Sequence, residues 1–135
     1  MRQTFRDLES GVMTGFQSES PLSSLAEWYL SVRDTPLDAL GVEDLCRAVR
    51  QELYLSEVLP FAVELLRTDV LEGYKYDGEL IVALGGLSSI VWEVDRDVAL
   101  EVLSIVEGFS FSKECSDVEL DASKLILNIR KGVGL

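Results

Sequence analysis

The chain has 135 residues, 47% of them hydrophobic, a length and composition that suit one folded domain, residues 1–135, with its own core. Its 24 acidic and 12 basic residues give a formal net charge of −12, which repels the phosphate backbone of nucleic acids and attracts basic partners. We therefore expect no nucleic-acid partner, and an acidic surface that either recognises a basic protein or simply keeps the domain in solution.

The amino-terminal residues 1–19 combine glycine, serine and threonine with scattered apolar residues, and they predict an irregular arm packed on the domain. A weak helix is the alternative to the irregular arm. These residues lack the uninterrupted apolar run of a signal peptide. The longest stretch without a charge, residues 80–92, is interrupted by Gly85 and Gly86 and is too short to span a bilayer. The sequence therefore predicts a cytoplasmic protein with no membrane partner.

The first two helices of the domain are marked by their ends and by their apolar periodicity. Pro21, at a first helical position, begins a helix that we expect to extend to about Arg33, and Pro36 keeps the residue before it out of the helical conformation. The next helix carries acid at its start and base further along, as the helix dipole favours. Its apolar stripe is formed by Val42, Leu45, Cys46, Val49 and Leu53.

Two more helices follow in the middle of the chain. Ser56 is expected to cap the first, with Pro60 near its first turn, where the missing N–H costs little. Asp77 is expected to cap the second, a short helix that the glycine pair at 85 and 86 ends. A short strand after Ile81 is the alternative, but strict alternation of apolar and polar residues is not sustained there.

The last helices are predicted in the same way. Ser88 or the serine after it restarts the helical pattern, and Asp95 is expected to cap a helix that Gly108 closes. Near the carboxyl terminus, residues 116–119 have the pattern of a capping box before an apolar run that Gly132 stops.

The whole pattern predicts an all-α fold, a single domain of about six to eight short helices stacked as helical hairpins. Residues 42–66 and 88–107 each have the pattern of two helices joined by a tight turn. Trp28 and Trp92 border charged faces and are expected to be half-buried. The residues expected to face the core in the later helices are Leu59, Val63, Leu66, Val98, Val102, Ile105, Val106, Val118, Leu125, Ile126 and Ile129.

The residue types that most enzymes use are scarce in this chain. There is no histidine, which removes Ser–His and Cys–His nucleophile pairs and every zinc site that needs imidazole. Cys46 and Cys115 are isolated and cannot supply a thiolate cluster. We therefore expect no enzyme, no catalytic residue, no cofactor and no metal. A carboxylate-based enzyme is the alternative, because some pair among 24 acids will lie close together.

The best candidate for a binding surface is the connection formed by residues 73–79 and the acids before it, which we call the tyrosine connection. Tyrosine offers a large rigid contact area with a polar tip, and neighbouring acids suit a basic partner. The competing interpretation is that Asp77 caps the following helix while one tyrosine folds back on the core. The candidate partner-binding residues are Asp69, Glu72, Tyr74, Tyr76 and Glu79.

Residues 40–84 show an unusual order of signals. A leucine-rich helix, VEDLCRAVRQ, leads into VLPFAVELL with its early proline, then into DVLEGYKYDGEL with two tyrosines before another apolar helix. This order resembles the CdiI immunity proteins of bacterial contact-dependent growth inhibition systems.

The resemblance implies a small cytoplasmic protein that binds and neutralises the C-terminal toxin domain delivered by a neighbouring cell. Toxins of these systems are often nucleases, and the acidic charge of this chain favours a basic one. The candidate residues of the tyrosine connection would then contact the toxin. An acidic helical adaptor or regulatory module that binds another protein is the alternative, beside the carboxylate enzyme.

Overall fold

The computed structural model describes residues 3–9, 24–71, 78–111 and 116–135. Within these ranges the chain forms eight α-helices, one 3₁₀-helix and no strand, so the predicted all-α fold is confirmed. The α-helices are α1 (Phe5–Glu9), α2 (Ser24–Val32), α3 (Val42–Arg50), α4 (Leu55–Thr68), α5 (Glu79–Gly85), α6 (Ser89–Val94), α7 (Arg96–Glu107) and α8 (Ser116–Val133), and the 3₁₀-helix is η1 (Leu37–Ala39).

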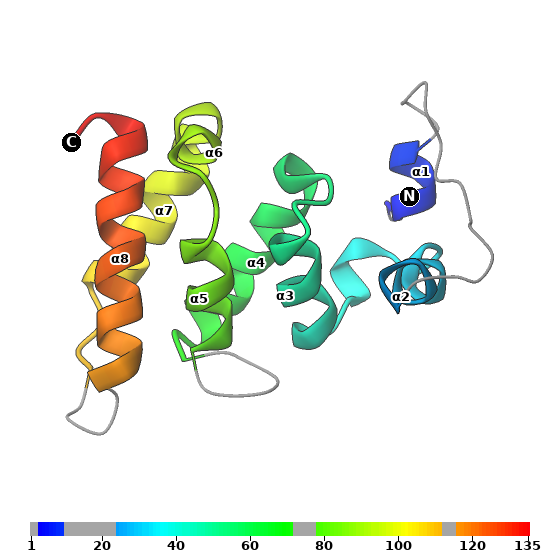
Figure 1. The fold of residues 1–135 in the computed structure, drawn as a ribbon, viewed down its shortest axis with the longest axis horizontal. Helices are drawn as coiled ribbons and strands as arrows, with labels where there is room; N and C mark the ends of the chain where they lie inside the picture. The colour runs from blue at the N-terminus through cyan, green and yellow to red at the C-terminus, as the bar shows by residue number, and fades with distance from the viewer. Residues whose placement is uncertain (1–2, 10–23, 72–77, 112–115) are drawn as a thin grey trace.

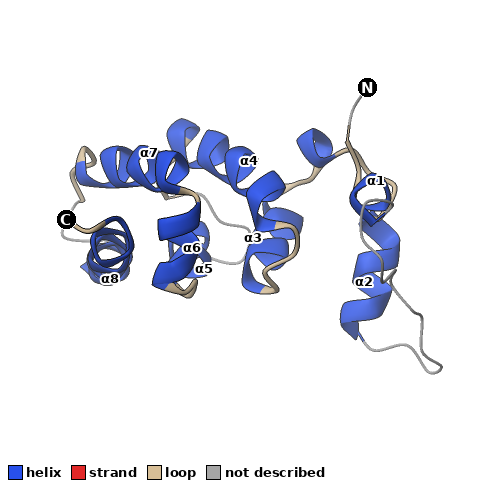
Figure 2. Cartoon of the chain, turned by 90° about the horizontal axis from the view of Figure 1, so that it is seen from above, coloured by secondary structure: helices blue, strands red, loops and turns tan. Residues whose placement is uncertain are grey.

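The helices follow one another across the molecule, from α1 and α2 at one end to α8 at the other (Figure 1). As predicted, α3 packs on α4 and α6 packs on α7. The contact of α4 with α7 joins these pairs, α5 packs on α3, and α8 closes the far end by packing on α5, α6 and α7. Figure 2 shows the same order from above.

The core is built from the apolar stripes that the helical periodicity predicts. Cys46 and the other central stripe residues are buried, while those at the stripe edges are half-buried. The predicted core residues that are buried are Leu45, Cys46, Val49, Leu59, Val63, Leu66, Val102, Val106, Leu125 and Ile129. Those that are half-buried are Val42, Leu53, Val98, Ile105, Val118 and Ile126.

The amino-terminal helix α1 is held to the body by aromatic and ionic contacts. Phe5 is fully buried, with its ring 5.6 Å from Tyr29 and 6.0 Å from Tyr54 between centroids. Glu9 accepts hydrogen bonds from the Tyr29 hydroxyl at 2.5 Å and from the guanidinium of Arg33, Nε at 2.7 Å. The bond from Arg33 holds the pKa of the Glu9 carboxyl below its usual range. The predicted arm is therefore partly helical and anchored.

Helix α2 ends close to the predicted position. The helix ends at Val32, shortly before Pro36, as predicted. Its predicted start at Pro21 lies outside the described residues. Trp28 is half-buried, as expected, because its indole N–H donates to the Asp44 carboxylate at 2.9 Å and the Arg47 guanidinium lies 5.1 Å from its ring centroid.

Of the serine caps predicted for α4 and α6, the structure shows one. The Ser88 hydroxyl accepts from the backbone N–H of Ile90 at 3.3 Å, which confirms the cap of α6. The predicted cap by Ser56 is wrong, because α4 begins at Leu55 and the Ser56 hydroxyl donates to the Asp95 carboxylate at 3.2 Å. Asp95 occupies the N-cap position of α7 without capping it. The hydrogen bond between Ser56 and Asp95 thus joins the starts of α4 and α7, and neither side chain caps its own helix.

The start of α5 depends on a glycine. Gly78 occupies the N-cap position with φ +83°, a left-handed conformation that glycine adopts without cost. A Cβ atom at this position would lie 2.8 Å from Val118 Cγ1 at the start of α8. Asp77, the predicted cap, lies outside the described residues, while the predicted end at Gly85 is confirmed.

The packing of α8 overturns two expectations. Gly132 lies inside α8, which continues to Val133 and is followed by Gly134 at φ +80°, so Gly132 does not stop the helix. A Cβ atom on Gly132 would lie 2.4 Å from the Ser89 carbonyl oxygen and 2.9 Å from Trp92 Cβ. This close approach of α8 to α6 buries Trp92 completely, where half-burial was expected.

Candidate functional site

The tyrosine connection predicted as a binding surface is described only at its ends. Asp69 follows α4, is exposed, and its carboxylate accepts from the backbone N–H of Leu71 at 3.0 Å. The backbone N–H of Gly78 donates to the Leu71 carbonyl at 2.8 Å, so the two ends of the connection meet. The candidate residues Glu72, Tyr74 and Tyr76 lie outside the described residues.

Glu79, the last of the predicted binding residues, belongs to the interior. Its side chain is only 1% exposed, and it accepts from Arg50 Nη1 at 3.0 Å. A carboxylate buried in this way cannot contribute to a contact surface in this conformation. The sequence could not signal this, because Arg50 lies 29 residues earlier in the chain and meets Glu79 only when α3 packs on α5.

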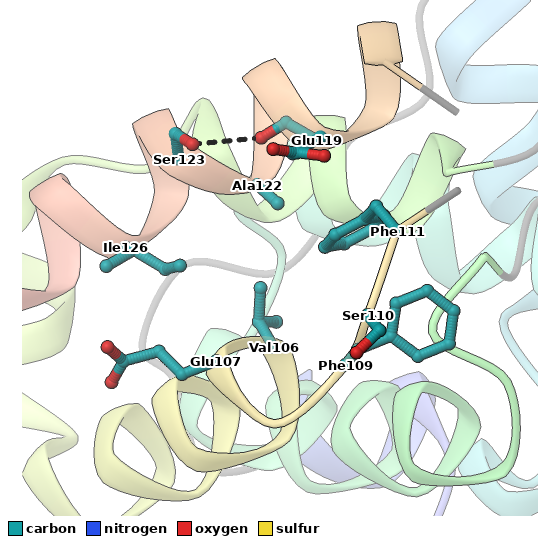
Figure 3. Close-up of a pocket in the computed structure, with 9 residues that line it drawn as sticks. All are labelled: Val106, Glu107, Phe109, Ser110, Phe111, Glu119, Ala122, Ser123 and Ile126. Carbon is teal, nitrogen blue, oxygen red and sulfur yellow. Dashed lines mark hydrogen bonds between the residues drawn. The ribbon is translucent and has the colours of Figure 1, made fainter. Parts of the chain in front are cut away.

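The described structure contains a second candidate surface, an open groove between α8 and the segment that follows α7 (Figure 3). The groove has a volume of about 450 Å³, within the range of ligand pockets. We call it the phenylalanine groove. It is lined by Val106, Glu107, Phe109, Ser110, Phe111, Glu119, Ala122, Ser123 and Ile126.

The floor and walls of the phenylalanine groove are apolar. Val106 of α7 and Ala122 of α8 are each 1% exposed and form its floor. Phe109, Phe111 and Ile126 are half-buried and form its walls. The two phenylalanine rings stand edge to face, with centroids 4.8 Å apart and planes at 69°, a geometry that aromatic pairs prefer.

The rim of the phenylalanine groove is acidic. Glu107 at the end of α7 is exposed and accepts from Arg130 Nη2 at 2.7 Å. Glu119 in the first half of α8 is exposed, and none of the described cations forms an ion pair with its carboxylate. The Ser123 hydroxyl donates to the Glu119 backbone carbonyl at 3.0 Å, the bond drawn dashed in Figure 3. The groove thus combines an apolar interior with two carboxylates at its mouth.

The phenylalanine groove was not predicted. Its aromatic residues come from the short segment after Gly108, and its acids come from two different helices. The one local signal is the pair of phenylalanines on either side of Ser110, because aromatic side chains next to a helix-ending glycine need a packing partner. The sequence does not show that these phenylalanines pack against α8, because that contact depends on how α8 folds back on α7.

The described residues contain no cluster of three or more His, Cys, Asp or Glu side chains that could hold a metal ion. No α-helix in the same ranges has both the length and the apolar content needed to cross a membrane.

Comparison with models of known protein families gives a match. The model of a family described as CDI immunity proteins matches residues 13–102, more than half of the chain. Among curated proteins, none matches the chain in sequence. The matched span includes the predicted tyrosine connection, and it ends before the first residue of the phenylalanine groove, Val106.

Proposed function

This chain belongs to the family of CDI immunity proteins, and we propose that it is a non-catalytic inhibitor that binds and neutralises the cognate C-terminal toxin domain of a contact-dependent growth inhibition system. The observation that carries the proposal is the family match over residues 13–102. It favours this role over the acidic adaptor and the carboxylate enzyme that the sequence left open. We place the inhibition in the cytoplasm.

We further propose that the toxin domain is basic, and that it is a nuclease. The support is electrostatic. Even if each of the 12 basic side chains paired with a different acid, 12 carboxylates would be left without a cation inside the chain. Nuclease domains carry positive surfaces for phosphate backbones, and an acidic protein is complementary to such a surface.

The association rate constant for this toxin domain should fall at least about tenfold when the ionic strength is raised from low to high salt, because charge steering is screened beyond a Debye length of about 8–10 Å near physiological salt. The dissociation rate constant should change much less. Stopped-flow fluorescence with the purified toxin domain measures both. An association rate constant that is the same at both salt concentrations would remove the acidic charge from the mechanism.

A further inference from the structure

We propose that the phenylalanine groove is the surface that receives a cationic side chain, arginine or lysine, from the toxin domain. This inference rests on the proposed function and adds to it the place and the chemistry of one contact. The groove lies between α8 and the end of α7, and its rim residues Glu107, Ser110, Glu119 and Ser123 are exposed.

The apolar interior matches the stem of such a side chain. Arginine and lysine carry several methylene groups that pack on apolar surface while the charged tip stays near water. Phe109 and Phe111 are only half-buried, so part of each ring is available to a partner. A guanidinium or ammonium group beside an aromatic ring is attracted by the ring quadrupole. The same attraction already holds Arg47 on Trp28 elsewhere in this protein.

The acidic rim matches the charged tip. A carboxylate and a guanidinium form charge-assisted hydrogen bonds, which are about twice as strong as neutral ones. Glu119 has no ion pair with any cation in the described ranges, and Arg130 reaches Glu107 through one oxygen only. An incoming cation would therefore meet one carboxylate that has no ion pair within the described ranges, that of Glu119, and one that Arg130 already partly neutralises. A purely apolar or acidic side chain would desolvate the Glu119 carboxylate without supplying a cation.

The position of the groove agrees with a contact surface. Gly78, at the end of the tyrosine connection, packs against Val118, the residue before Glu119. Gly78 and the groove therefore both lie beside the amino-terminal half of α8. The groove also lies outside the span shared with the family, where a surface suited to one toxin can differ from those of other members.

The test measures affinity for the toxin domain encoded in the same locus by calorimetry, with two variants and a matched control for each. Glu119→Lys reverses the charge at the rim, and Glu27→Lys makes the same change on the exposed face of α2 at the other end of the molecule (Figure 1). Ser123→Tyr fills the groove, and Ser104→Tyr places the same ring on an exposed position of α7 that does not line it.

Each groove variant is expected to weaken binding at least about tenfold, while each control changes it by less than about threefold. All four replace exposed residues, and melting curves check that they remain folded. If wild type binds and all four variants bind alike, the groove is not the contact surface, although the proposed function stands. If wild type does not bind, both are overturned. Self-association of the chain that Glu119→Lys abolishes would assign the groove to a second copy and overturn the inference.

Discussion

Replacing Arg50 with alanine is expected to lower the free energy of unfolding by about 3 kcal/mol, because it removes a cation that pairs with the buried carboxylate of Glu79. The lower end of the range for broken buried pairs applies, since the Arg50 side chain is 36% exposed and part of its attraction is already screened by water. Urea denaturation of the variant and wild type measures the difference.

The matched control for Arg50 is Arg67→Ala. Arg67 also bridges helices, from α4 to Glu101 of α7, but every partner in that contact is exposed. Its removal should cost less than about 1 kcal/mol. Glu79→Lys, which would place a buried cation next to Arg50, should destabilise the protein as well. Equal losses for Arg50→Ala and Arg67→Ala would mean that the buried pair contributes no more than a surface pair.

Replacing Gly132 with alanine is expected to lower the free energy of unfolding by about 1–3 kcal/mol, the usual cost of overpacking. The new methyl group would lie 2.4 Å from the Ser89 carbonyl oxygen, so α8 must move away from α6 or distort. The loss should appear even though alanine is favoured over glycine inside a helix by about 0.5–1 kcal/mol. Thermal unfolding followed by circular dichroism measures it, together with increased exposure of the Trp92 indole in tryptophan fluorescence.

Gly85→Ala provides the comparison for Gly132→Ala. Gly85 is the last residue of α5, and a Cβ atom there would meet only Leu125 Cβ at 3.9 Å, an ordinary contact. This variant should be as stable as wild type or slightly more stable. A Gly132→Ala protein that is equally stable would show that α8 and α6 are not packed as closely as the structure places them.

Local signals in the sequence were sufficient for the helices and their buried faces. The stripe of α3 and the glycines that end α5 and α7 are found as predicted, because periodicity and chain termination depend on neighbouring residues. Caps were less predictable. Ser56 and Asp95 both have the residue type of a cap, yet they bond to each other across 39 residues. A tertiary partner of this kind competes with the local backbone, and the local pattern does not reveal it.

The surface was harder to predict than the core. Glu79 has the appearance of a solvated acid beside two tyrosines, and only the packing of α3 on α5 shows that it is buried. Asp69 is exposed and, with Glu72, Tyr74 and Tyr76, stays a proposed contact of the toxin. The phenylalanine groove forms between the segment after α7 and helix α8, and no local pattern in the sequence shows that these two segments pack together. Taken separately, Phe109 and Phe111 look like residues that follow a helix end, and Glu119 and Ser123 look like the solvent-facing side of a helix.

The most direct test of inhibition by binding is the growth of cells that produce the toxin domain of the same locus together with this protein, followed by purification of the toxin domain from those cells. The account predicts that growth continues only when this protein is present, and that the two proteins are recovered as one complex. Arrest of growth despite equal amounts of this protein would contradict neutralisation. Growth without a recoverable complex would contradict inhibition by binding.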